Sequence, residues 1–239
     1  MSFAAHVDQL LHTLEQPPIA VQGRVTRIVG MTIEASGMRA PIGALCEIQT
    51  PHHPAVIAEV VGFQQSTLYL MPVSELQGIE PGARIQRTGL SERVSVGPEL
   101  LGRVTDALWN PLYDLPTIRA SATLPVSGSE VPALKKAPIR DILDTGIKAI
   151  NACFTVGQGQ RMGLIAGSGV GKSMLLGMLT RNTKADVVVI GLIGERGREA
   201  QEFVSEILGP EGLKKSIVVI APANSSPVMR RKAAERVHV

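Results

Sequence analysis

The sequence predicts a small all-β domain followed by an α/β domain, and two patterns of apolar residues lead to this prediction. Between residues 19 and 90, short β-rich runs are separated by glycine or proline. Their turn signals are about eight to twelve residues apart, which is typical of a small barrel or sandwich. From about residue 139 onwards, strand, loop, helix, strand, helix and strand patterns follow one another. This order predicts a βαβαβ unit with a parallel sheet.

The composition is that of a globular protein and argues against several classes of function. The chain has 239 residues, enough for one large or two modest domains. Its net charge of +3 is too small to indicate nucleic-acid binding, and 3% aromatic residues argue against base stacking. No apolar run approaches the roughly 18 residues of a membrane span, and the N-terminus lacks the layout of a signal peptide. We therefore expect a cytoplasmic protein.

The two cysteines, Cys46 and Cys153, lie far apart in the sequence and form no CxxC motif. This spacing predicts two free buried thiols rather than a disulfide or a metal site.

The first 138 residues divide into three predicted segments. Residues 1–18 predict an amphipathic helix, with apolar residues at helical spacing and a stop at two consecutive prolines. Residues 19–90 are the predicted β-barrel domain, with its strands in the runs GRVTRIVGMTIEA, ALCEI, AVIAEVVGF, STLYLMPV and ARIQRTG. Residues 91–138 are a connecting segment rich in glycine and proline, in which we expect Trp109 to be a packing anchor.

Residues 139–239 are the predicted α/β domain. Its expected helices are residues 139–154, 172–183, 197–209 and 226 onwards, and its expected strands are residues 161–167, 186–194 and 215–223. The run DVVVIGLIG is apolar throughout, which is typical of a strand buried on both faces of a parallel sheet. In the second of these helices we expect one apolar face, formed by Met174, Leu175, Met178 and Leu179.

The run AGSGVGKS lies between a predicted strand and a predicted helix, which is the context of a phosphate-binding loop. Glycines let the backbone curl so that N–H groups face phosphate oxygens, and the helix N-terminus favours the same anion. Lys172 is expected to contact the β- and γ-phosphates of ATP, and the Ser173 hydroxyl to ligate Mg²⁺. Ala166 replaces the usual first glycine, which is tolerable if its φ is negative. The candidate nucleotide-binding residues are Ala166, Gly167, Ser168, Gly169, Val170, Gly171, Lys172 and Ser173.

Glu195 follows the next predicted strand, in the run DVVVIGLIGERGRE. The carboxyl ends of strands in an open α/β sheet border the ligand crevice. A carboxylate there can orient and deprotonate a water that attacks the γ-phosphate. Arg196 beside it is expected to contact γ-phosphate oxygens or to anchor the loop. The candidate catalytic residues are therefore Lys172, Glu195 and Arg196.

Together these runs resemble the ATPases of type III protein export systems, relatives of the catalytic subunit of rotary ATP synthases. The run LDTGIKAINACFTVGQGQRMGLIAGSGVGKS is similar to the flagellar branch in particular, and VGPELLGRVTDALWNPLYD resembles the segment that joins barrel and ATPase domain. The resemblance covers about residues 20–230. It implies a RecA-like P-loop ATPase domain behind a β-barrel, and a Mg-ATP-hydrolysing subunit that energises export of flagellar proteins.

The resemblance also implies partners and a location. It implies a homohexamer, a stator-like regulator at the N-terminal helix, and contacts with the export gate and with exported flagellar proteins or their chaperones. We expect no nucleic-acid partner, because the net charge is mild and aromatic residues are scarce. The expected location is cytoplasmic, peripherally at the inner face of the cytoplasmic membrane.

This chain departs from the family pattern in its length. Family members continue with a strand ending in a magnesium-orienting aspartate and with a part that supplies an arginine finger. Neither is found here, so we expect an incomplete ATPase domain that is aggregation-prone and hydrolyses ATP weakly or not at all. The alternatives are a truncated, catalytically inactive paralogue that binds nucleotide or a partner, an injectisome ATPase of virulence secretion, and a helicase-like ring that binds RNA. The scarcity of aromatic residues and the mild charge argue against the last.

Overall fold

The computed structural model describes residues 21–88, 93–113, 121–126, 131–167 and 169–239. The chain forms two compact units, Met1–Ser91 and Glu92–Val239. The amphipathic helix predicted for residues 1–18, and Ser168 of the predicted loop, lie outside the described residues.

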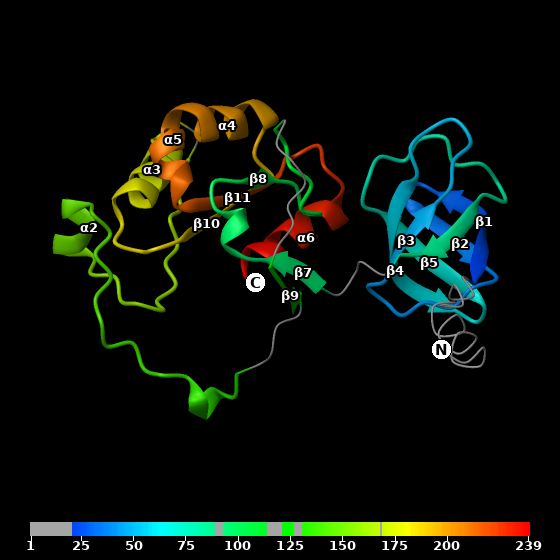
Figure 1. Ribbon diagram of the computed structural model, residues 1–239, viewed down its shortest axis with the longest axis horizontal. Coiled ribbons are helices and arrows are strands. Elements are labelled where there is room, and N and C mark those ends of the chain that lie inside the picture. Colours follow the sequence, from blue (N-terminus) through cyan, green and yellow to red (C-terminus); the bar gives the residue numbers. More distant parts are fainter. Residues whose placement is uncertain (1–20, 89–92, 114–120, 127–130, 168) are drawn as a thin grey trace, which may run out of the picture. The chain divides into compact units, whose positions relative to one another are not determined.

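The first unit contains a closed antiparallel barrel (Figure 1). Its strands are β1 (Gln22–Val29), β2 (Thr32–Ser36), β3 (Leu45–Ile48), β4 (Val56–Gln64), β5 (Thr67–Pro72) and β6 (Arg84–Arg87). They pair in the order β1-β2-β5-β4-β3-β6, and β1 closes the barrel by pairing with β6. Every run predicted as β-rich contains a strand, so the predicted all-β domain is confirmed as a barrel. Closure removes the unpaired edges that an open sheet would expose.

Alternating side chains fill the barrel interior. Along β2 and β5 every second residue is buried, as the two-residue period of a strand requires. The packed interior consists mostly of fully buried aliphatic residues, among them Ile33, Ile48, Val60, Leu70 and Ile85. Cys46 lies in this core and Cys153 is exposed, so the prediction of two buried thiols is wrong for Cys153.

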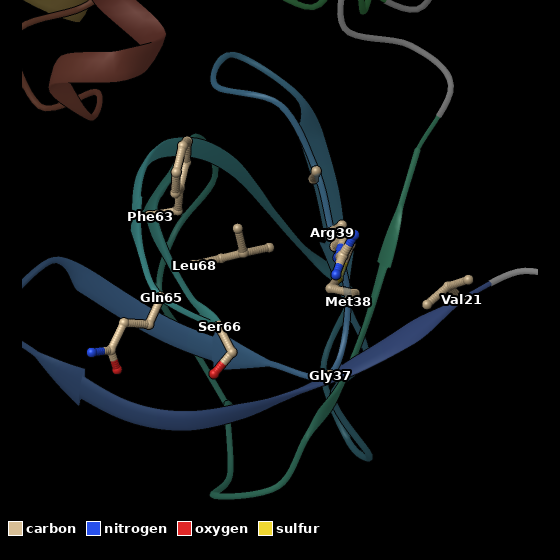
Figure 2. A pocket seen from close by; sticks show the side chains of 9 residues that line it. Val21, Gly37, Met38, Arg39, Phe63, Gln65, Ser66 and Leu68 are labelled. Carbon is tan, nitrogen blue, oxygen red and sulfur yellow. The ribbon is translucent and has the colours of Figure 1, made fainter.

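A hollow of about 690 Å³ opens at one end of the barrel unit (Figure 2). Phe63 and Leu68 border one side, and Met38 and Arg39 border the other. The lining is mainly apolar, and two of its apolar residues, Phe63 and Val21, are 63% and 60% exposed.

The second unit is built around a three-stranded parallel sheet in the order β10-β11-β8. Its strands and helices are β7 (Arg93–Val96), η1 (Pro98–Leu100), β8 (Val104–Thr105), β9 (Ala122–Pro125), η2 (Ala133–Lys135), α2 (Lys148–Cys153), α3 (Lys172–Asn182), β10 (Val188–Ile193), α4 (Gly197–Glu202), the π-helical η3 (Phe203–Leu208), α5 (Gly209–Lys214), β11 (Ser216–Ala221) and α6 (Pro227–Val237). β7 and β9 form a separate antiparallel pair. The α/β class predicted for this part of the chain is confirmed.

Helices cover both faces of the parallel sheet (Figure 1). One face packs Ile190, Leu192 and Val218 against Phe203 and Leu208 of the α4–η3–α5 segment. The other face packs β11 against α6, in a cluster that contains Val219, Ala221, Met229 and Ala233.

β8 comes from the segment that the sequence predicts as an irregular connection. Only two residues long, it is too short to show a strand period, yet Val104 and Thr105 pair with Val218 and Val219 of β11. The turn that follows is closed by the Asp106 carboxylate, which accepts hydrogen bonds from the backbone N–H groups of Leu108 and Asn110 at 2.7 and 2.9 Å.

Trp109 in this turn packs against the sheet and against α6, as predicted for an anchor. The guanidinium of Arg236 lies 5.7 Å from the centre of its ring, a cation–π contact between the β8 turn and α6. Burial lowers the pKa of Arg236 below its ordinary value, against the opposing effects of the Asp106 and Glu235 carboxylates.

Several elements of the second unit differ from the prediction. Residues 161–167 form no strand, and Met162, Leu164 and Ile165 are exposed. In the predicted helix 139–154, only α2 is helical. β10 is not buried on both faces, because Ile190 and Leu192 are buried on one face whereas Val189 on the other is 41% exposed.

The helix predicted to close at Gly209 and Pro210 does end there, because Gly209 is the C-cap of η3, and a separate helix, α5, begins at the same point. Gly209 has a φ of 64°, a conformation that favours glycine, and Pro210 stands in the first turn of α5, where its missing N–H leaves no hydrogen bond unmade.

The predicted apolar face of α3 is also wrong. Met174 is 51% and Met178 39% exposed, while the buried residues of α3 are Gly177 and Thr180. Gly177 lets α3 approach η3 closely, since a Cβ at this position would lie 2.3 Å from Cγ2 of Ile207. Arg181 of α3 donates a hydrogen bond to the carbonyl of the same Ile207. The spacing of apolar residues could not predict this packing face, because the contact depends on the absence of a side chain at Gly177 and not on an apolar side chain.

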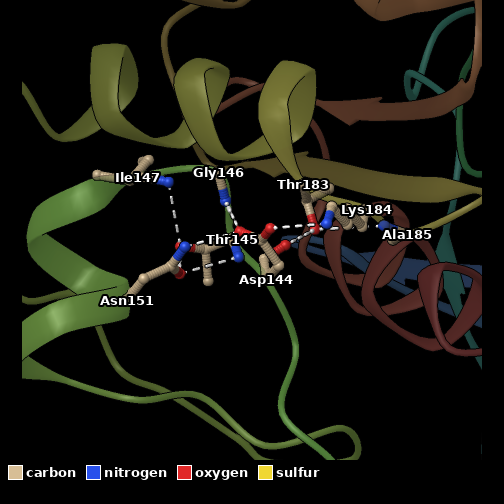
Figure 3. Close-up of polar contacts among 8 residues, drawn as sticks. All are labelled: Asp144, Thr145, Gly146, Ile147, Asn151, Thr183, Lys184 and Ala185. Carbon is tan, nitrogen blue, oxygen red and sulfur yellow. Dashed lines mark hydrogen bonds and ion pairs between the residues drawn. The ribbon is translucent and has the colours of Figure 1, made fainter.

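Asp144 joins the segment before α2 to the end of α3 (Figure 3). Its carboxylate accepts the backbone N–H of Gly146 at 2.8 Å and the side-chain amide of Asn151 at 2.6 Å, and it pairs with Lys184 at 3.2 Å. Its carbonyl accepts the backbone N–H of Lys184 at 3.1 Å. These contacts explain why the predicted helix is interrupted here, because Asp144 favours a side-chain turn over helical hydrogen bonds.

The two thiols should react at very different rates with an alkylating reagent. Cys153 should be modified in the folded chain, whereas burial shields Cys46 and raises its pKa to about 11, which keeps it protonated. Mass spectrometry should find one label on the native chain and two after denaturation. Two labels at native rates would contradict the closed barrel around Cys46.

Gly177→Ala should destabilise the second unit. The methyl would meet Ile207, so an overpacking loss of about 1–3 kcal/mol should exceed the gain in helix propensity of about 1 kcal/mol. Urea unfolding followed by circular dichroism measures the change. Ile207→Ala should destabilise less when added to Gly177→Ala than when made alone. Stabilisation by Gly177→Ala would show that α3 and η3 do not pack this closely.

Asp144→Asn should reduce stability at neutral pH and have little effect in acid. The pKa of Asp144 is lowered first by the N–H of Gly146, then by the hydrogen bonds from Asn151 and Lys184. A carboxyl with a depressed pKa stabilises the fold above its unfolded pKa of about 4, and this stabilisation is lost as pH falls through the folded pKa. Unfolding midpoints of the two proteins across pH 2–7 test this. Lys184→Met, which removes only one of the three contacts, should give a smaller version of the same pH dependence.

Candidate functional site

The predicted phosphate-binding loop precedes α3, and two of its glycines have a backbone conformation that favours glycine. Gly169 has a φ of 77°, and Gly171, the N-cap of α3, has a φ of 93°. Both values favour glycine over any residue with a Cβ. The carbonyl of Gly171 accepts the N–H of Leu175 at 2.9 Å, so α3 begins directly at Lys172. The chain therefore turns tightly into a helix N-terminus, where anions are favoured.

Ala166 is compatible with the loop. Among the residues the structure describes, the non-glycine residues with positive φ are Gln65 and Trp109, so Ala166 is not one of them. Alanine therefore needs no strained conformation at the first motif position, as the sequence predicted.

A hollow of about 650 Å³ lies beside the loop. It is lined by loop residues and by residues after β10, namely Ala166, Gly167, Gly169, Gly171, Lys172, Ser173, Met174, Gly194, Glu195, Arg196, Glu199, Glu202 and Ile207. The structure thus brings the predicted catalytic residues and most of the predicted binding residues together. Val170 does not line the hollow and is 67% exposed.

Lys172 and Glu195 meet in this hollow. The ammonium nitrogen of Lys172 lies 3.3 Å from Oε1 of Glu195, although 23 residues separate them in the sequence. Their side chains are 45% and 36% exposed. A pair this exposed contributes on the order of 0.2–1 kcal/mol to stability, so a stronger ligand for either group can replace it.

The end of the β10–β11 ladder fixes the position of Glu195. Gly194 donates its N–H to the carbonyl of Ala221 at 2.8 Å, and the carbonyl of Glu195 accepts the N–H of Ala223 at 2.9 Å. Gly194 has a φ of 78°, which turns the chain out of the strand at this point. The sequence analysis did not name Gly194 as a residue that positions the site. The signal that could have identified it is a glycine between an apolar strand and a charged turn.

Arg196 is the N-cap of α4 and lines the same hollow. Its side chain is 84% exposed and pairs with Glu199 at 3.3 Å. The guanidinium is therefore directed to its own helix by a weak surface ion pair.

The residues present fit a polyphosphate. A Cβ built at Gly167, Gly169 or Gly171 would have no atom within 4 Å apart from its chain neighbours, so the space beside these glycines is open. The hydroxyl-bearing Ser173 stands in the first turn of α3, and the Lys172 ammonium can donate to phosphate oxygens. Among the described residues, no three His, Cys, Asp or Glu side chains form a metal-binding cluster. Mg²⁺ here would therefore need ligands from the nucleotide and water besides Ser173.

The hollow in the barrel unit is chemically different. Its lining contains one charged side chain, Arg39, and is mainly apolar, whereas the loop hollow contains Lys172, Arg196 and three carboxylates. Of these two hollows, the loop hollow has the greater number of basic side chains that can donate to a phosphate ligand. In the part of the chain that the structure describes, no helix has the length and apolar character to cross a membrane.

Two family models match the chain. The β-barrel domain of the ATP synthase alpha/beta family matches residues 25–89, and the nucleotide-binding domain of the same family matches residues 146–237. The two matches correspond to the barrel and to the part of the second unit that contains the loop hollow.

Curated relatives carry the name flagellum-specific ATP synthase. The chain is 48% identical to that of Pseudomonas aeruginosa over 98% of the chain and 53% of the relative. It is 48% identical to that of Salmonella typhimurium over 91% of the chain and 50% of the relative. It is 45% identical to that of Bacillus subtilis over 89% of the chain and 49% of the relative. The chain thus spans about half the length of the curated relatives it matches.

Two solved structures of the ATPase EscN, from the type III secretion system of enteropathogenic E. coli, have the same fold. The assembled ATPase EscN is 32% identical, with a TM-score of 0.79 over 90% of this chain and 52% of that chain. EscN in complex with its central stalk EscO gives a TM-score of 0.81 over 90% and 53%. With both domain models matched in order on one chain and relatives alike along almost all of it, this chain belongs to the ATP synthase alpha/beta family.

Proposed function

We propose that this chain carries the Mg-ATP site of a type III protein export ATPase, a motor subunit that energises export of flagellar proteins. The observation that carries this proposal is the meeting of Lys172 and Glu195 in one hollow beside an open glycine loop. The names of the relatives support the export assignment. The identity of 36–48% with flagellum-specific relatives, against 32% with EscN, favours flagellar export over an injectisome.

In this proposal, the loop backbone and Lys172 bind the β- and γ-phosphates of ATP. Ser173 ligates Mg²⁺, which neutralises phosphate charge when bound. Glu195 accepts a proton from the attacking water, since its backbone is held at the carboxyl end of β10 while its side chain is free to turn from Lys172. Arg196 contacts γ-phosphate oxygens after leaving Glu199, a surface pair that is easily broken.

The proposed partners follow from the family and not from the described residues. EscN was solved as an assembled ATPase and together with a central stalk. We extend this to a homohexamer of the whole protein, with a regulator at residues 1–18 and with the export gate and flagellar export substrates or their chaperones as further partners. The proposed location is cytoplasmic, peripherally at the inner face of the cytoplasmic membrane.

Lys172→Ala should weaken nucleotide binding by about tenfold or more. The variant loses a charge-assisted hydrogen bond to phosphate, worth about 1.5–3 kcal/mol. Titration of the chain with Mg²⁺ and a non-hydrolysable ATP analogue, followed by calorimetry, measures the change. Lys135→Ala, which alters an exposed lysine of η2 outside the hollow, is the control and should bind like the parent chain. Equal affinities of all three proteins would contradict the proposed site.

Any turnover should also depend on Glu195. The chain is expected to hydrolyse Mg-ATP weakly, and Glu195→Gln should lower that rate by about 10²–10⁴, the usual contribution of a general base. Hydrolysis unchanged in Glu195→Gln would assign the base to another group.

A further inference from the structure

We infer that Glu195 has a second role, which rests on the proposed function: it occupies the phosphate-binding ammonium of Lys172 and so sets the affinity of the site for nucleotide. The 3.3 Å contact between Lys172 and Glu195 joins the two side chains that the proposed reaction uses separately. In that reaction Lys172 binds the phosphates, and Glu195 accepts a proton from the attacking water. A carboxylate next to the ammonium lowers the positive electrostatic potential that a phosphate meets there.

The charges in the hollow make this competition unfavourable to an entering anion. Two basic side chains, Lys172 and Arg196, face three carboxylates, those of Glu195, Glu199 and Glu202. Each basic group is paired with one of them, Lys172 with Glu195 and Arg196 with Glu199. A polyphosphate that reaches Lys172 must therefore displace the Glu195 carboxylate or lie against it. Both cases oppose binding, the first by a lost pair and the second by like-charge repulsion.

The geometry allows the displacement. The backbone of Glu195 stays fixed by its hydrogen bond to Ala223 and by the hydrogen bond of Gly194 to Ala221, so the side chain alone must move. At 36% exposure that side chain has access to water. Phosphate binding at Lys172 would thus release Glu195 for its role as base, and the lysine would hold the carboxylate until then. The same contact would link occupancy of the loop to availability of the base.

This inference predicts that Glu195→Gln binds nucleotide more tightly than the parent chain. The expected gain in affinity is about two- to fivefold, the size of a half-exposed ion pair. It should shrink at high salt, since a pair so exposed is screened. The measurement is calorimetric titration with a non-hydrolysable ATP analogue at low and at high salt, with circular dichroism to verify folding.

Glu199→Gln is the matched control. It removes the same charge from the same hollow, but its partner is Arg196 and not Lys172. A gain confined to Glu195→Gln, and lost when Lys172→Ala is added, supports the inference. Equal gains in both glutamine variants, or no gain in Glu195→Gln, overturn it while leaving the proposed nucleotide site in place. Failure of the parent chain and of every variant to bind the analogue overturns the proposed function, and the inference with it.

Discussion

The parallel pairing of β10 with β11 is the constraint on which the candidate site depends. Because the carboxyl ends of parallel strands meet at one edge of the sheet, the chain after β10 and the chain after β11 leave side by side. The hydrogen bond between Glu195 and Ala223 is the direct result. α3 packs through Gly177 on η3, which leads into α5 and β11. Lys172, at the start of α3, is thereby brought to the edge where Glu195 stands.

The barrel follows a different physical rule from the parallel sheet. Its six strands satisfy their hydrogen bonds by closure, and its aliphatic interior is fully buried. Both units expose some apolar side chains, such as Phe63 in the barrel unit and Ile165 and Met174 in the second unit.

Much of this structure could be predicted from the sequence where one residue type determines the outcome. The β-rich runs between glycine and proline turn signals predicted the barrel strands, and the glycines of AGSGVGKS predicted a curled loop before α3, where Gly169 and Gly171 have positive φ values. The position of Glu195 followed from an apolar strand and the general rule for strand ends. These signals are local, so one sequence contains them.

The rest depends on contacts between distant residues. The two-residue strand β8 can be recognised only by its pairing with β11. The packing face of α3 depends on the space that Gly177 leaves and Ile207 fills. The pairing of Lys172 with Glu195 instead of with solvent is likewise a property of the assembled site. Residues 161–167 have the composition of a strand but form none, since composition cannot supply a neighbouring strand to pair with.

Amide hydrogen exchange of this chain, with and without Mg²⁺ and a non-hydrolysable ATP analogue, tests the central claim most directly. The claim is that the loop before α3 and the turn after β10 form one nucleotide site. The account predicts slower exchange in both segments, residues 167–175 and 194–200, with the barrel unchanged. Protection of the barrel hollow instead, or of the loop without the turn that contains Glu195, would contradict it.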